Sequence, residues 1–149
     1  MYEKPKGFSF IRVFCIFIGG IGTIGGIITI LAMQNPSINQ TLQQSNQGFL
    51  ATFWDMLRNA GFLIGGILIF KMRNHGRLLI VICATLGLLE VFYHTFLAIS
   101  SPAYNFTPLL ISYTVIAILI NSGVLAYFSN KNVKTFILSY QGTEQNEPK

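Results

Sequence analysis

The sequence predicts an all-α integral membrane protein, a bundle of four membrane-spanning helices. Only 10% of its 149 residues are charged and 52% are hydrophobic, whereas soluble domains carry about 25% charged residues. The mean hydropathy is +0.55. Four apolar runs each exceed the ~20 residues that a membrane-spanning helix needs, and they lie at 8–33, 49–72, 77–100 and 107–128. This composition excludes a water-soluble globule.

The four runs belong to a single predicted domain, residues 1–140, and they are too long to be barrel strands. Transmembrane β-strands are about 10 residues long, and a backbone in lipid has to satisfy its own hydrogen bonds, which favours helices. Run 8–33 follows Lys4 and Lys6, as the apolar part of a signal peptide follows basic residues. We expect it to be retained as a span, because that apolar part is only about 7 to 15 residues long and ends in a small-residue cleavage site.

The basic residues predict the orientation of the spans. Connections 34–48 and 101–106 contain no Lys or Arg. Nine of the ten basic residues lie near the opposite ends of the spans: Lys4, Lys6, Arg12, Lys71, Arg73, Arg77, Lys131, Lys134 and Lys149. By the positive-inside rule both termini are therefore cytoplasmic. The net charge of +5 then reflects topology and contact with anionic lipid. No nucleic-acid partner is expected, because a basic stripe on a water-facing surface is lacking.

Two segments outside the spans have patterns of their own. Connection 34–48 contains eight Gln or Asn among fifteen residues, and we predict a polar lid on the bilayer in which Ser37 caps a short turn. Near the C-terminus, apolar residues recur at positions i, i+3, i+4 and i+7 and predict a short interfacial amphipathic helix at about 130–140. These residues are Val133, Phe136, Ile137 and Tyr140. Residues 141–149 are polar, and we predict that they are disordered.

Segment 127–136 reads Tyr-Phe-Ser-Asn-Lys-Asn-Val-Lys-Thr-Phe, an aromatic helix end followed by Val-Lys and another aromatic residue. This ending resembles that of uncharacterised small bacterial four-span inner-membrane proteins. The resemblance covers ten residues. It implies a multi-pass protein of the bacterial inner (cytoplasmic) membrane and no particular activity.

Four acidic, basic or histidine side chains lie six or more residues inside the spans, where a charge costs about 2.5 to 3.5 kcal/mol and therefore needs a partner or a cavity. Asp55 and Arg58 share one face of the second span, and Glu90 and His94 share one face of the third. These helices run antiparallel, and a helix rises about 1.5 Å per residue, so Arg58 and Glu90 both lie about 14 to 15 Å from the outer end. We therefore predict an Arg58–Glu90 ion pair, and an Asp55–His94 hydrogen bond nearer the outer surface.

Two residues of the last span complete this polar intramembrane cluster. Tyr113 lies near the depth of Asp55 and His94, within reach of a hydrogen bond. Asn121 belongs to the interior face of the same span. Three interpretations are open: a paired network that fixes which helices touch, a proton or ion site in which Glu90 titrates with His94 as relay, and a catalytic acid–base pair. The network is favoured, because each acid has one base to neutralise it.

Small residues predict close packing of the helices. The first two spans each carry a GxxxG step near mid-bilayer, and such a step lets two helix backbones approach closely. The glycines on the predicted packing faces are Gly19, Gly22, Gly26, Gly61, Gly65 and Gly87. We expect them to pack within one chain, with a seam between copies of the chain as the alternative.

No motif in the sequence indicates a particular reaction, cofactor or metal site. Cys15 and Cys83 belong to no Cys-x-x-Cys pair, and we predict buried free thiols, with a quinone-linked thiol oxidoreductase as the alternative.

The favoured function is a non-catalytic accessory, assembly or interaction subunit, whose partners are the lipid bilayer and either another membrane protein or further copies of this chain. The alternative is a small oligomeric proton- or ion-coupled transporter or channel that uses Glu90 and His94. A membrane enzyme ranks third, because the outer connections supply only amides, hydroxyls and Tyr104.

Overall fold

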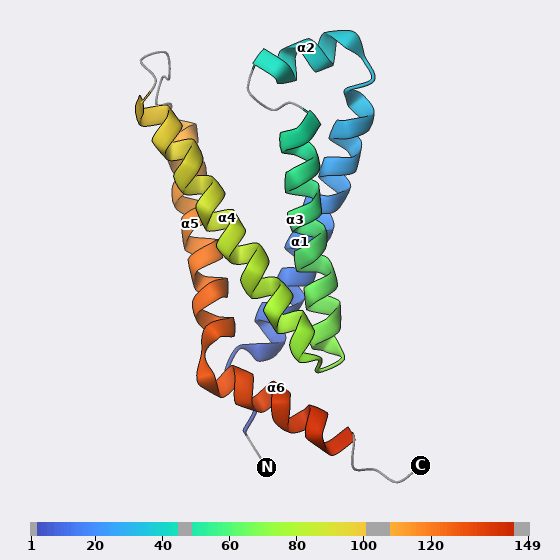
Figure 1. Ribbon diagram of the computed structural model, residues 1–149, viewed down its shortest axis with the longest axis vertical. Helices are drawn as coiled ribbons and strands as arrows, with labels where there is room; N and C mark the ends of the chain where they lie inside the picture. Colours follow the sequence, from blue (N-terminus) through green and yellow to red (C-terminus); the bar gives the residue numbers. More distant parts are fainter. Residues whose placement is uncertain (1–2, 45–48, 101–107, 145–149) are drawn as a thin grey trace.

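The computed structural model describes residues 3–44, 49–100 and 108–144, and the secondary structure in these ranges is entirely α-helical. The helices are α1 (Phe8–Ala32), α2 (Pro36–Gln44), α3 (Phe49–Phe70), α4 (Asn74–Ser100), α5 (Pro108–Ser129) and α6 (Lys131–Glu144), shown in Figure 1. The predicted all-α class is confirmed for this part of the chain. The tail predicted to be disordered, 141–149, is helical up to Glu144, and 145–149 lie outside the described residues.

Four of these helices are long and apolar enough to cross a membrane, as the sequence predicted. The spanning segments are Phe8–Ala32, Phe49–Phe70, Asn74–Leu97 and Ile111–Ser129. Only 11% to 22% of the most apolar window in each span is buried inside the protein. A surface this apolar is stable where lipid covers it. The protein is therefore a multi-pass membrane protein.

The connection between α3 and α4 is shorter than predicted, because α3 ends at Phe70 and α4 already begins at Asn74. Met72 adopts a left-handed conformation with φ 51°. The N–H of Met72 donates to the carbonyl of Ile69 at 2.9 Å, and that of Arg73 donates to the carbonyl of Leu68 at 3.0 Å. This pair of bonds is a Schellman motif, which satisfies the last carbonyls of a helix and ends it.

The spanning helices form two antiparallel pairs, α1 with α3 and α4 with α5, and α3 packs on α4. Figure 1 shows that the two pairs meet at the end where α6 lies and diverge toward the end where α2 lies. We call these the narrow end and the wide end. Aromatic side chains of α4 near the wide end are exposed: Phe92 and Tyr93 at 60% each and Phe96 at 67%. The predicted bundle is thus packed at the narrow end and open at the wide end.

The hydrophobic core lies at the narrow end. Its fully buried side chains come from α1, α3, α4, α5 and α6, and they include Phe8, Ile69, Ile80, Phe128 and Ile137. Because five helices contribute to one cluster here, this end fixes how the two pairs are joined.

Helix α6 crosses the narrow end, in the segment where the sequence predicts an interfacial helix. Val133, Phe136 and Ile137 of its apolar stripe are buried at 2% exposure or less, whereas Tyr140 is 49% exposed. The ring of Phe136 lies edge-on to that of Phe8, with 5.2 Å between the centroids. Most of the stripe therefore packs on the ends of the spanning helices of the same chain.

The predicted polar lid contains helix α2, and its cap differs from the prediction. The Oδ1 atom of Asn35 accepts hydrogen bonds from the N–H of Ser37 at 3.1 Å and from its hydroxyl at 2.7 Å. Asn35 is thus the capping residue, and Ser37 is not. The physical reason is that Pro36 occupies the first helical position, where its fixed φ and missing N–H are favourable. The cap is therefore the residue before Pro36, two residues earlier than predicted.

Candidate functional site

The candidate site is the polar cluster inside the membrane-spanning part, centred on Arg58. Its Nη2 atom donates to Oδ1 of Asp55, one turn earlier on α3, at 2.7 Å. Its Nη1 atom forms an ion pair with the carboxylate of Glu90 on α4. The side chains of Arg58 and Glu90 are only 15% and 19% exposed. The expected Arg58–Glu90 pair is present, and it joins the α1/α3 pair of helices to the α4/α5 pair.

The predicted Asp55–His94 hydrogen bond is wrong. Asp55 is bound by Arg58 of its own helix. The Nε2 atom of His94 lies 3.9 Å from Oε1 of Glu90, also on its own helix. Helices α3 and α4 diverge toward the wide end (Figure 1). Neighbours on one helix therefore remain close there, while partners on the other helix move out of reach.

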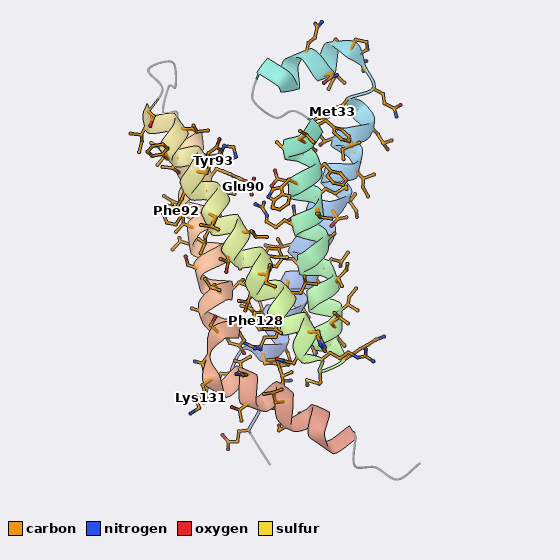
Figure 2. The ribbon with its side chains drawn as sticks, viewed as in Figure 1. Met33, Glu90, Phe92, Tyr93, Phe128 and Lys131 are labelled. Carbon is orange, nitrogen blue, oxygen red and sulfur yellow. The ribbon has the colours of Figure 1, made fainter. Side chains whose placement is uncertain are left out.

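The pairing gives the cluster a different charge balance from the predicted one. One guanidinium is shared by two carboxylates, so the four groups carry one negative charge when His94 is neutral and none when it is protonated. His94 is 53% exposed, and its ring lies edge-on to that of Tyr93 at 5.7 Å. Figure 2 shows Glu90 on the side of α4 that faces α3. The charged centre therefore lies between the helix pairs, with its titratable imidazole toward the wide end.

A cavity of about 220 Å³ lies between α1, α3 and α5, beside Arg58. Its lining is mainly apolar, with Arg58, Asn59 and Asn121 among its polar groups. The guanidinium of Arg58 thus lies between the carboxylate cluster on one side and this cavity on the other.

Tyr113 and Asn121 line the cavity instead of binding the carboxylates. Tyr113 is 66% exposed, and within the described part of the chain it has no hydrogen bond to Asp55 or His94. The Nδ2 atom of Asn121 donates to the carbonyl of Ala117, one turn earlier on α5, at 2.8 Å. The predicted cluster is thereby divided into a charged group between α3 and α4 and an amide and phenol group on α5.

The predicted packing glycines of α1 lie against α3. A Cβ atom placed on Gly19 would lie 2.7 Å from the carbonyl oxygen of Asn59, one on Gly22 would lie 2.6 Å from Nδ2 of Asn59, and one on Gly26 would lie 2.7 Å from Cβ of Met56. Real Cβ atoms essentially never approach other atoms this closely. These glycines therefore allow α1 and α3 to pack almost backbone to backbone.

The other predicted packing glycines join the remaining helices of the same chain. A Cβ atom on Gly65 would lie 2.6 Å from Cγ1 of Ile80, and one on Gly87 would lie 2.6 Å from Oδ1 of Asn121. The thiol of Cys83 occupies the space beside Gly61. All six glycines thus lie at contacts within one chain. Cys15 and Cys83 are free and buried, as the sequence predicted.

Three important polar residues escaped the sequence reasoning. Asn59 lines the cavity and packs on Gly22; an amide within an apolar run was its only signal. Arg77, taken as a topology signal, is 8% exposed and binds the carbonyl of Phe128. Arg12 lies over the ring of Phe70 at 3.7 Å. Their partners are backbone or aromatic groups. Pairing acidic with basic residues in the sequence cannot identify such partners.

No protein-family model, curated protein sequence or solved structure matches this chain. Within the described ranges, no three His, Cys, Asp or Glu residues come together in an arrangement that could hold a metal ion. The function therefore has to be inferred from the cluster, the cavity and the packing.

Proposed function

We propose that the protein is a non-catalytic interaction or assembly subunit of a larger membrane complex. The observation that carries this proposal is the Arg58–Glu90 ion pair, which joins the two helix pairs while Asp55 binds the same guanidinium. Removing one partner of such a pair leaves an unpaired charge, so the cluster favours one arrangement of the helices. A cluster that fixes the arrangement of the helices has a structural role, which requires no substrate.

The wide end is the part of the molecule proposed to receive the partner. The helix pairs diverge there (Figure 1), and large side chains from both α4 and α5 are exposed, among them Phe96 and Tyr113. Association of helices in lipid is driven by packing and interhelical hydrogen bonds. A membrane-spanning helix of a partner, or of a second copy of this chain, would gain both by packing against these exposed side chains at the wide end.

The proposed location is a bacterial inner membrane, with both termini in the cytoplasm. The described basic residues outside the charged cluster support this orientation, because they gather at the narrow end, where α1 begins, α3 meets α4, and α6 lies (Figure 1). They include Lys4, Lys71, Arg73 and Lys131. Cytoplasmic connections are the ones enriched in Lys and Arg.

Site-specific photo-crosslinking in native membranes tests the proposed subunit role. A benzoylphenylalanine is placed at Tyr113 or Phe96 at the wide end, or at Phe17 on α1 as the control; these residues are 66%, 67% and 64% exposed. We expect the wide-end positions to give a discrete protein adduct and Phe17 to give none. If all three positions react with lipid alone and the tagged chain is recovered from mild detergent as a single species, the subunit role is wrong.

A second candidate function is a small proton- or ion-coupled transporter or channel. It would be oligomeric, because four helices of one chain leave little room for a substrate path. One observation favours it: two carboxylates share one guanidinium, and His94 lies 3.9 Å from Glu90. Carboxylates and histidines inside membrane spans often mark proton or ion pathways. In proteoliposomes Glu90→Gln should then abolish a pH-dependent flux that Glu3→Gln leaves intact. Absence of flux in the unmodified protein removes this candidate.

A further inference from the structure

A second site lies at the narrow end, away from the charged cluster. It is a pocket of about 340 Å³ between the α3–α4 connection and α6, lined by Phe70, Lys71, Met72, Arg73 and Tyr140. We call it the basic pocket. Its walls combine two cationic side chains, a phenol and two apolar side chains, so it offers both charge and apolar contact.

The cations at the basic pocket form no ion pair with Glu3, Asp55 or Glu90, the acids whose side chains the structure describes. Lys71 and Arg73 are exposed. Asp55 and Glu90, the described acids within the spans, are bound by Arg58. The field at the pocket is therefore positive, and an anion would be attracted to it.

Arg12 of α1 adds a third positive charge beside the pocket. Its guanidinium lies 3.7 Å from the ring centroid of Phe70, which lines the pocket. The Nε atom of Arg12 is buried and has no hydrogen-bond partner within the described residues. Arg12 therefore adds positive charge behind the Phe70 wall of the pocket, which strengthens the attraction of an anion to the pocket.

The position of the pocket identifies the kind of anion. The α3–α4 connection joins two membrane-spanning segments, Phe49–Phe70 and Asn74–Leu97, so it lies where the hydrocarbon ends and the headgroups begin. Phe70 is 55% exposed and would contact acyl chains while Lys71 and Arg73 reach the headgroup. Basic pockets at such a level bind anionic lipid headgroups. We propose that the basic pocket binds the phosphate group of an anionic phospholipid.

Native mass spectrometry of the full chain, released from vesicles of phosphatidylcholine and phosphatidylglycerol, tests this site. The unmodified protein should retain phosphatidylglycerol in preference to phosphatidylcholine. In the variant Lys71→Gln/Arg73→Gln retention should fall about tenfold or more, because the charged hydrogen bonds from these two side chains to the bound phosphate are lost. The matched control is Lys131→Gln/Lys134→Gln, which removes the same charge from exposed positions outside the pocket and should leave retention unchanged.

The remaining outcomes contradict the proposal. Equal losses in both double variants would show attraction to the overall charge of the narrow end, without a site. Equal retention of the two lipids by the unmodified protein would show that the pocket does not select an anion. Displacement of phosphatidylglycerol by an equimolar amount of glycerol phosphate, which has no acyl chains, would assign the pocket to a soluble phosphate compound. Circular dichroism of both double variants checks that they keep the helical content of the parent.

Discussion

The guanidinium of Arg77, near the start of α4, donates a hydrogen bond of 3.0 Å from Nη1 to the carbonyl oxygen of Phe128, at the end of α5. Its Nε atom donates to Oδ1 of Asn74 at 2.9 Å, which holds the side chain in place. The last carbonyls of a helix have no partner within the helix. Arg77 therefore acts as a cap for α5, supplied by the neighbouring helix, at the point where the chain turns into α6.

Loss of this cap should destabilise the protein. We expect Arg77→Met to lower the free energy of unfolding by about 1 to 3 kcal/mol, because the buried carbonyl of Phe128 is left without a donor. Lys131→Met is the control, since Lys131 is exposed and should change stability by no more than about 0.5 kcal/mol. Equilibrium unfolding in mixed micelles, followed by circular dichroism, measures both. Equal stability of the two variants would contradict the capping role.

Two adjacent glycines of α1 should respond in opposite ways to alanine. A Cβ atom at Gly19 meets the backbone of Asn59 and Leu63 on α3, which cannot move aside, whereas one at Gly20 meets nothing within 4 Å. Gly19→Ala should therefore cost about 1 to 3 kcal/mol by overpacking. Gly20→Ala should be neutral or stabilising, because alanine favours helix. Steric trapping in bicelles measures both variants, and a smaller loss for Gly19→Ala than for Gly20→Ala would show that α1 and α3 do not pack as described.

The spans and the main ion pair were predictable because each depends on distance along the chain. Apolar runs longer than about 20 residues define the spans, and the rise per residue places Arg58 and Glu90 at one depth. Asp55 and His94 also lie at one depth, and yet they do not pair, because depth says nothing of the divergence between two helices. That divergence depends on side-chain packing across the whole narrow end.

The contacts of Arg77 and of α6 could not be predicted from the sequence, for other physical reasons. Phe128 accepts from Arg77 through its backbone carbonyl, a group that every residue carries, so no pattern in the sequence marks it. The periodicity of α6 shows that one face is apolar. It does not show whether lipid or protein covers that face, and in the structure Phe136 and Ile137 are covered by protein.

The charged cluster predicts an order of stability among three variants. Arg58→Gln should cost most, roughly 3 kcal/mol, because it leaves the carboxylates of Asp55 and Glu90 without their cation. Glu90→Gln should cost less, since Arg58 keeps Asp55. Asp55→Asn should cost least, below about 1 kcal/mol, because Asp55 is 47% exposed and pairs within its own helix. Unfolding in mixed micelles gives the order, and equal losses for all three variants would mean that no pair joins α3 to α4.

The left-handed conformation of Met72 gives a test of the α3–α4 connection. The test compares two substitutions that remove the same side chain, so side-chain packing does not contribute to the difference. Met72→Gly and Met72→Ala both remove the methionine side chain, so they lose the same contacts. They differ at φ 51°, which glycine adopts freely and alanine adopts at a cost of about 1 to 2 kcal/mol. Part of this difference is offset because glycine has more conformational freedom in the unfolded chain.

We therefore expect Met72→Gly to be more stable than Met72→Ala by about 1 kcal/mol in thermal or denaturant unfolding. An alanine variant as stable as the glycine variant would show that α3 does not end in the Schellman motif, and that the connection adopts another turn.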